Sequence, residues 1–202
     1  MQKVLPLLFA VWVPYSLSAA ALQTGSPAPS PKPVSEHFKN SEQSPEPSFR
    51  RHVVPLMSRL GCSGRECHGS FQGRGGFQLS LFGYDFEKDF DQITKDDKGD
   101  EGGVRINLQQ PAESLIVQKG AALMKHKGKE RFPKGSWEYN LLVKWIGSGA
   151  KMDVAETGEF ARLEVFPKEI RFRSAMDSTQ LRVLAHWKDG TVEDVTSFTR
   201  FR

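Results

Sequence analysis

The sequence predicts a mainly α-helical domain followed by a short β-rich segment, and three observations support this. Between residues 49 and 150 the apolar residues recur at intervals of three and four, as on helices that bury one face. After residue 160 they alternate with polar residues, which is typical of half-buried strands. The only two cysteines of the chain lie in the helical part, close to each other and directly before a histidine. We therefore expect a helical domain that carries a cysteine–histidine site.

The N-terminal residues have the order of a secretory signal. A charged start, Met1 to Lys3, precedes the apolar run Val4 to Val13 and the small residues Ser18 to Ala21. We predict a signal peptide over 1–21, with cleavage near Ala19 to Leu22, and a periplasmic or cell-surface location. The run contains a proline and is shorter than the roughly 20 apolar residues of a spanning helix, so no membrane span is expected after cleavage.

Charge and composition limit the possible partners of the chain. The net charge is +4, and removal of Lys3 with the signal leaves +4 − 1 = +3, which is mild and comes without a nucleic-acid-binding motif. We therefore expect no nucleic acid partner. Residues 22–48 are rich in proline and serine and lack apolar periodicity, which predicts an extended, disordered linker.

Three helices are expected in the domain at 49–150. Phe49, Val53, Leu56 and Leu60 have helical spacing, with Pro55 as a kink or a late helix start. Further helices are expected from Pro111 to Val117, with proline at an early position, and from Ser136 to Ile146. Between them, the acidic stretch Asp96 to Glu101 is expected to be a solvated loop, because its spacing does not match a calcium site.

Short antiparallel strands are expected after residue 160. The segments Leu163 to Val165, Ile170 to Phe172 and Leu181 to Ala185 alternate at period two, and Lys188 to Thr191 is a turn signal. These strands occupy about 40 residues, whereas a complete immunoglobulin-type sandwich needs about 100. Either the chain is a fragment or this part of a sandwich needs another edge to pair with.

The cysteine–histidine site consists of Cys62, Cys67 and His68. In a C-x-x-C-H motif two thiols bind the vinyl groups of haem c and the adjoining imidazole ligates the iron. Here four residues separate the cysteines instead of two. A disulfide is the first alternative, but it would close a very short loop and would leave the histidine unexplained. Zinc is the second alternative, although the sequence has no second paired cluster to complete four ligands.

Two residues are candidates for the opposite axial position of a haem iron. His126 would be expected to give a lower reduction potential and Met124 a higher one. A vacant position is the third possibility. Basic residues surround both candidates, and they would either steer an acidic redox partner or form a solvated loop: Lys125, Lys127, Lys129, Arg131 and Lys134. We expect His52 to be exposed and to have no role.

The motifs together resemble a known family. Residues 49–150 resemble the cytochrome c-like domain with a C-x4-C-H site found in large exported planctomycete proteins. The matching segments are Val53 to Cys62, Cys67 to Gly69, Gly76 to Asp85, Pro111 to Leu115, His126 to Gly128 and Trp145 to Ala150. The resemblance implies one haem c, bound by Cys62, Cys67 and His68, and favours His126 over Met124 as distal ligand. It covers about half the chain.

The C-terminal segment has a resemblance of its own. Residues 160–202, especially Leu163 to Thr196, are similar to the first half of a bacterial Ig-like domain of group 2. In the proteins concerned this domain is followed by others, so the resemblance implies further domains downstream. The expected fold class is a cytochrome c-like domain, mainly α, followed by a partial all-β Ig-like sandwich.

The sequence therefore predicts an exported monohaem c-type cytochrome module that transfers electrons to or from a redox partner protein. One alternative is a haem domain with an open distal site that acts on a small oxidant such as peroxide. Another is a structural or interaction module at the cell surface, without haem and with a Cys62–Cys67 disulfide. Because no catalytic motif appears in sufficient context, we assign no catalytic residue and no independent enzymatic activity.

Overall fold

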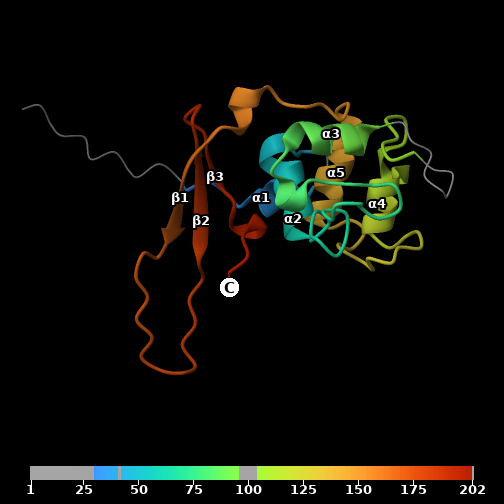
Figure 1. Cartoon of the computed structure of the whole chain (residues 1–202). Coiled ribbons are helices and arrows are strands. Elements are labelled where there is room, and N and C mark those ends of the chain that lie inside the picture. The colour runs from blue at the N-terminus through green and yellow to red at the C-terminus, as the bar shows by residue number, and fades with distance from the viewer. Residues whose placement is uncertain (1–29, 41, 96–103, 202) are drawn as a thin grey trace, which may run out of the picture. The chain divides into compact units, whose positions relative to one another are not determined.

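Helices make up the first part of the described chain, and a three-stranded antiparallel sheet makes up the last part (Figure 1). The computed structural model describes residues 30–40, 42–95 and 104–201. The expected signal peptide, the start of the expected linker and the acidic stretch lie outside them. The helices are α1 (Val34–His37), α2 (Val54–Arg59), α3 (Phe86–Thr94), α4 (Leu115–Gly120) and α5 (Trp137–Gly147). The strands are β1 (Phe160–Phe166), β2 (Arg182–Trp187) and β3 (Val192–Asp194).

The expected helix at 49–60 is confirmed, but it consists of two parts. A π-helical turn at Phe49–Val53 leads into α2, and Pro55 lies in the first turn of α2, a position that proline commonly takes. Gly61 has a φ of 80° and ends the segment, because this left-handed conformation suits glycine. The cysteine-containing loop therefore starts at a defined point.

The two later helices begin close to where they were expected. The side chain of Ser136 accepts a hydrogen bond from the Tyr139 N–H and caps α5. A 3-10 turn at Pro111–Glu113 precedes α4. Helix α3 was not predicted, although Asp85 caps it by accepting from the Lys88 N–H and its first turn is acidic.

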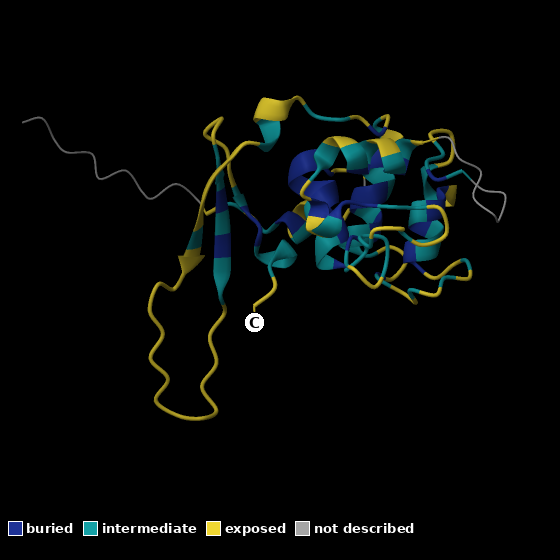
Figure 2. Cartoon of the chain, in the orientation of Figure 1, coloured by how far each residue is buried: buried dark blue, intermediate teal, exposed yellow. Residues whose placement is uncertain are grey.

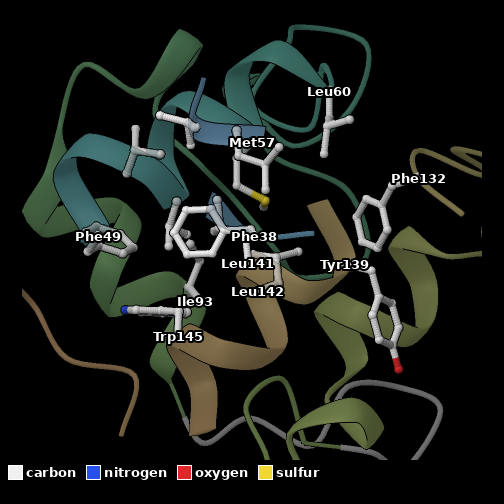
Figure 3. Packing of buried hydrophobic residues seen from close by; sticks show 14 of the residues in the cluster. Phe38, Phe49, Met57, Leu60, Ile93, Phe132, Tyr139, Leu141, Leu142 and Trp145 are labelled. Atoms are coloured by element: carbon white, nitrogen blue, oxygen red, sulfur yellow. The ribbon is translucent and has the colours of Figure 1, made fainter. Parts of the chain in front are cut away.

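The core lies between α5 and the segment that contains α2 (Figure 3). Trp145 is 1% exposed, and its ring centre lies 5.4 Å from that of Phe49. Leu141, Leu142 and Ile93 are also buried in this cluster. Burial of each large apolar side chain contributes roughly 1.5–3 kcal/mol, so this core holds the helices that surround the site.

The expected linker differs from the structure in its second half. Val34 and Phe38 lie four residues apart on and beside α1, and both are buried in the core cluster. The side-chain amide of Asn140 donates to the backbone oxygens of Phe38 and Lys39, each at 3.1 Å. Burial of Val34 and Phe38, together with the hydrogen bonds from Asn140, binds this segment to the helical core despite its proline-rich composition.

The sheet has the order β1-β2-β3, with Leu163 opposite Ala185 and Leu184 opposite Asp194. The turn expected at residues 188–191 is confirmed, since it joins β2 to β3. The strand expected at Ile170 to Phe172 is wrong. These residues belong to a long loop between β1 and β2 that Figure 2 shows as exposed, and no strand of the described chain pairs with them.

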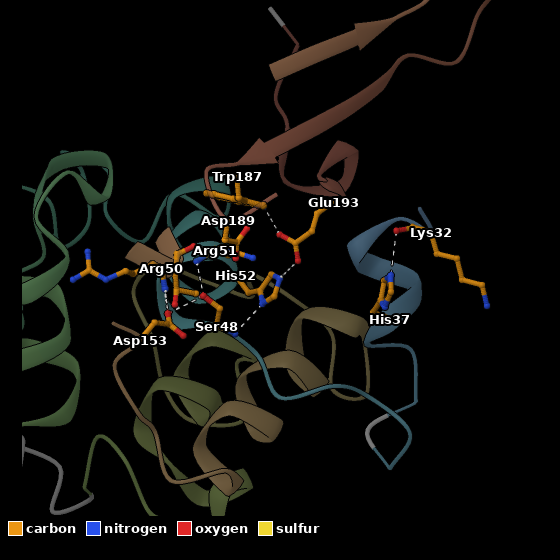
Figure 4. A network of polar contacts seen from close by, with 11 residues as sticks. Lys32, His37, Ser48, Arg50, Arg51, His52, Asp153, Trp187, Asp189 and Glu193 are labelled. Carbon is orange, nitrogen blue, oxygen red and sulfur yellow. Dashed lines mark hydrogen bonds and ion pairs between the residues drawn. The ribbon is translucent and has the colours of Figure 1, made fainter. Parts of the chain in front are cut away.

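A polar network connects the π-helical turn to the sheet (Figure 4). The Arg51 guanidinium donates to Asp189 Oδ2 at 2.5 Å and lies over the Trp187 ring. His52 accepts from the Ser48 N–H at Nδ1 and donates from Nε2 to Glu193 Oε1 at 2.9 Å. The expectation that His52 is exposed is therefore wrong. It is buried, because the sheet supplies the carboxylate that its second nitrogen needs.

Candidate cofactor-binding site

The residues from Gly61 to Gly69 form a compact loop held by its own backbone. The Cys62 N–H donates to the Met57 oxygen, and the His68 N–H donates to the Cys62 oxygen, both at 2.9 Å. The Gly69 N–H donates to the Gly64 oxygen at 3.0 Å. The wider spacing of the cysteines is therefore taken up by turns inside the loop, and the histidine stays next to the first cysteine.

Close packing within the loop requires glycine at position 69. A Cβ at Gly69 would lie 1.9 Å from the backbone oxygen of Ser63. Ser63 is 1% exposed, and its hydroxyl lies 3.1 Å from that of Ser58 in α2. The glycine after the histidine thus allows the loop to close on itself.

A cavity of about 1020 Å³ opens beside this loop. This volume lies at the upper end of the roughly 300–1,000 Å³ found for cofactor and ligand sites. Its apolar lining comes from α2, α4 and the loops between the helices: Met57, Phe77, Leu115, Ile116 and Phe132. A second hollow of about 380 Å³ at residues 167–179 has neither cysteine nor histidine in its lining. The larger cavity is therefore the candidate site.

Two histidines of the cavity lining have the same tautomer. His68 donates from Nδ1 to the Phe77 oxygen at 3.1 Å, and His126 donates from Nδ1 to the Lys129 oxygen at 3.2 Å. A carbonyl only accepts, so Nδ1 carries the proton and Nε2 carries the lone pair in both neutral rings. The backbone of Arg74 is a second hydrogen-bond partner of the His68 ring. Nε2 of His126 has no hydrogen-bond partner among the described residues. Backbone carbonyls commonly orient metal-binding histidines in this way.

The rings of His68 and His126 lie close together and are stacked. The ring centres of His68 and His126 lie 6.4 Å apart, and the ring planes differ by 5°. Met124, the rival candidate, is half-buried and is not part of the cavity lining.

Burial keeps His68 in the form that binds metal. Desolvation lowers the pKa of His68 below its usual value, and nearby His126 and Lys119 act in the same direction. The ring is therefore neutral at neutral pH.

The two cysteines are free thiols in the structure and both line the cavity. Burial raises the pKa of Cys62 to about 11, so this sulfur is protonated at neutral pH. Arg131 donates from Nη2 to Cys67 Sγ at 3.3 Å and from Nη1 to the Leu60 oxygen at 3.3 Å. This arginine lies between the basic loop and the cysteine loop, and its contact with a cysteine 64 residues away was not predicted.

The cavity is strongly cationic. Among the described residues, its lining contains six basic side chains and one acidic side chain, Glu66. The basic side chains are Arg74, Arg105, Lys119, Lys125, Lys127 and Arg131. Arg105 also holds the segment that contacts His68, because its guanidinium lies over the Phe77 ring and donates to the Gly76 oxygen at 2.9 Å. An apolar ligand that carries negative groups fits this lining.

The cavity has few metal-ligating side chains, so it suits a cofactor that already contains ligands for its metal. Among residues 30–40, 42–95 and 104–201, no three His, Cys, Asp or Glu side chains gather closely enough to hold a metal ion. Zinc needs four ligands. A haem would bring most of the iron's donor atoms itself, and His68 and His126 would supply the donors from the protein. The haem carboxylates match the cationic lining, so the residues fit haem better than a bare ion.

Comparison with known proteins adds no further identification. No family model matches the chain, no curated protein matches its sequence, and no solved structure matches it. In the described part of the chain, no helix has the length and apolar character needed to cross a bilayer.

Proposed function

We propose that the chain is an exported monohaem c-type cytochrome module that transfers electrons. The observation that carries the proposal is the pair His68 and His126, whose ring centres lie 6.4 Å apart in a cavity that two free cysteines also line. Export is supported by the N-terminal signal pattern, and it would place the cysteines where haem c is attached. The family resemblance of residues 49–150 supports the same function.

Each residue of the site has a defined task in this proposal. Cys62 and Cys67 would hold the haem by thioether bonds, and His68 and His126 would be the ligands of its iron. Phe77, with the other apolar residues of the lining, excludes water from the site. A bound haem supplies one-electron oxidation and reduction, and two histidine ligands with a buried setting give a lower potential than a histidine–methionine pair.

The test is expression with the native N-terminus in a host that has haem c maturation machinery. We expect the mature protein to gain the mass of one haem and to give a pyridine haemochrome spectrum of the thioether type. The reduced protein should be low-spin and unchanged by carbon monoxide, because both axial positions are filled. Absence of the mass increase would contradict the proposal. Binding of carbon monoxide to the unaltered protein would favour an open site that acts on a small oxidant.

The redox partner of this module is proposed to be an acidic protein. Lys125 and Lys127 flank His126, line the cavity and are exposed. Neither forms an ion pair within the described chain, in contrast to Lys39 and Lys188 elsewhere. Cations around a redox site steer anionic partners toward it, and salt weakens this effect.

Small redox reagents of opposite charge test this surface. Reduction of anionic hexacyanoferrate(III) should slow by roughly tenfold in Lys125→Glu/Lys127→Glu at low ionic strength, while a cationic cobalt complex should react faster. Lys151→Glu/Lys168→Glu is the matched control, since both lysines are exposed and lie outside the cavity lining. Equal rates for all three proteins would exclude an electrostatic docking surface.

A further inference from the structure

The two edges of the sheet differ in how they are covered. Beyond β3, Pro33 forms a parallel bridge with Asp194, and Arg182 donates to the Pro31 oxygen at 2.9 Å. Strand β1 is the other edge, and no segment within the described ranges pairs with its outer side. An uncovered edge strand presents unpaired N–H and C=O groups, which are a template for another strand.

Strand β1 carries two charged residues, Arg162 and Glu164, and a register irregularity between Phe160 and Arg162, but its edge is not covered by another segment of the described chain. It contains neither proline nor lysine, and six of its seven residues are exposed (Figure 2). Leu163 and Val165 are 56% and 43% exposed, although they lie opposite the buried residues Ala185 and Val183 of β2. The apolar face of the sheet thus continues from the core onto an exposed edge.

The order of side chains along β1 is self-complementary. The strand is Phe160-Ala161-Arg162-Leu163-Glu164-Val165-Phe166, with apolar residues arranged symmetrically around Leu163 and opposite charges on either side of it. In an antiparallel pair with a two-fold axis at Leu163, each residue faces its mirror position in the other strand. Arg162 then faces Glu164, and Ala161 faces Val165. Cross-strand pairs of these kinds stabilise a sheet.

We propose that two copies of this chain associate through their β1 edges, antiparallel and around a two-fold axis at Leu163. Such an interface is isologous, so the contact between Arg162 and Glu164 of the second copy occurs twice. Within one chain these two side chains already lie 3.0 Å apart on one face of the strand, so the dimer joins two ion pairs into a group of four charges. The two Leu163 side chains meet on the opposite face. The proposal does not depend on haem binding.

Charge reversal gives a decisive test by sedimentation equilibrium from about 10 μM to about 1 mM, because an interface of this small size is weak. The unaltered protein should form dimers within this range. Arg162→Glu places glutamates opposite each other, and Glu164→Arg places arginines opposite each other. Each variant alone should therefore self-associate at least roughly tenfold more weakly.

An equimolar mixture of the two variants should recover the association. In the mixed pair each glutamate again faces an arginine, so a heterodimer is favoured although each variant alone associates more weakly. Circular dichroism and thermal unfolding check that both variants are folded. The matched control is Arg171→Glu, because Arg171 forms an exposed 2.6 Å pair with Glu169 in the loop after β1 and should leave dimerisation unchanged.

Three outcomes would overturn the proposal. The unaltered protein could remain monomeric up to about 1 mM, which would show that the β1 edge does not pair with a second copy of the chain. The mixture of variants could fail to associate more strongly than either variant alone. Arg171→Glu could weaken association as much as the β1 variants, which would show a general effect of charge.

Discussion

His52 and His126 lie in two polar regions of the same molecule and have opposite tautomers. His52 accepts a hydrogen bond from the Ser48 N–H at Nδ1 and donates one from Nε2 to Glu193. Both ring nitrogens of His52 therefore have partners within the protein. His126 uses Nδ1 for a backbone oxygen, and its Nε2 has no hydrogen-bond partner in the described chain. The difference separates a structural histidine from one that is available to a ligand.

The charged residues that directly flank the two histidines in sequence differ in the same way: they are paired beside His52 and without ion-pair partners beside His126 among the described residues. Beside His52, the cation Arg51 is paired with Asp189, and the network closes around it (Figure 4). Beside His126, Lys125 and Lys127 are exposed and lack such partners among the described residues. The region near the sheet is therefore complete without a ligand, whereas the cavity presents donors and charges that a ligand can use. Four variants test this contrast.

The largest effect is expected from removal of the thiols. Cys62→Ser/Cys67→Ser should abolish covalent attachment, because a hydroxyl does not replace the thiol in the thioether bond. Intact mass and haem staining after denaturing electrophoresis measure the loss. Retention of haem through denaturation would mean that attachment uses other residues.

The next effect concerns the distal ligand. His126→Ala should keep the haem mass but change the spectrum to a form that binds carbon monoxide, because one axial position is opened. Met124→Ala is the matched control and should leave the spectrum unchanged, since Met124 lies outside the cavity lining. The reverse result in this pair of variants would make the methionine the ligand.

A smaller effect, on stability alone, is expected from His52→Ala. The change leaves the Ser48 N–H and Glu193 Oε1 without this partner, and an unsatisfied buried polar group costs about 1–3 kcal/mol. Chemical denaturation should show a loss of about 2 kcal/mol in the free energy of unfolding. The haem spectrum should not change. A spectral change would show that His52 is coupled to the cavity.

The smallest effect is expected from Asp189→Asn, as a lower Tm above about pH 4 that disappears in acid. The hydrogen bond from Arg51 lowers the pKa of Asp189 to about 2. An unfolded aspartate has a pKa of about 3.9, so this pair stabilises the fold fully above about pH 4, and the contribution is lost as the pH falls toward 2. The variant should therefore show a flatter decline of Tm between pH 4 and 2. Parallel Tm curves would contradict the role of this pair.

Local patterns predicted much of the helical part correctly. The spacing of Phe49, Val53 and Leu56, the stop at Gly61 and the cap at Ser136 are local signals, and the structure confirms the helices that they define. Helix α3 had similar signals in Asp85 and its acidic first turn, and could have been found from them. The strand at Ile170 to Phe172 was wrong because alternation alone does not supply a pairing partner.

The candidate site was predictable only in part. Cys62, Cys67 and His68 lie within seven residues of sequence, so their shared chemistry was visible in the motif. The distal position was left between His126 and Met124, and only the structure puts the histidine ring 6.4 Å from that of His68 and leaves the methionine outside the cavity. The contact of Arg131 with Cys67 joins residues 64 positions apart, and no local signal marks it.

The sequence by itself determined the chemistry available within short stretches: two thiols beside an imidazole, the helical and alternating periods, and the self-complementary order of β1. Tertiary structure decided which distant groups meet. It placed His52 against Glu193 and His126 opposite His68, and it left β1 at an open edge within the described chain. The physical reason is that side-chain type and spacing are local properties. Burial, hydrogen-bond partners and tautomers depend on the elements that pack together.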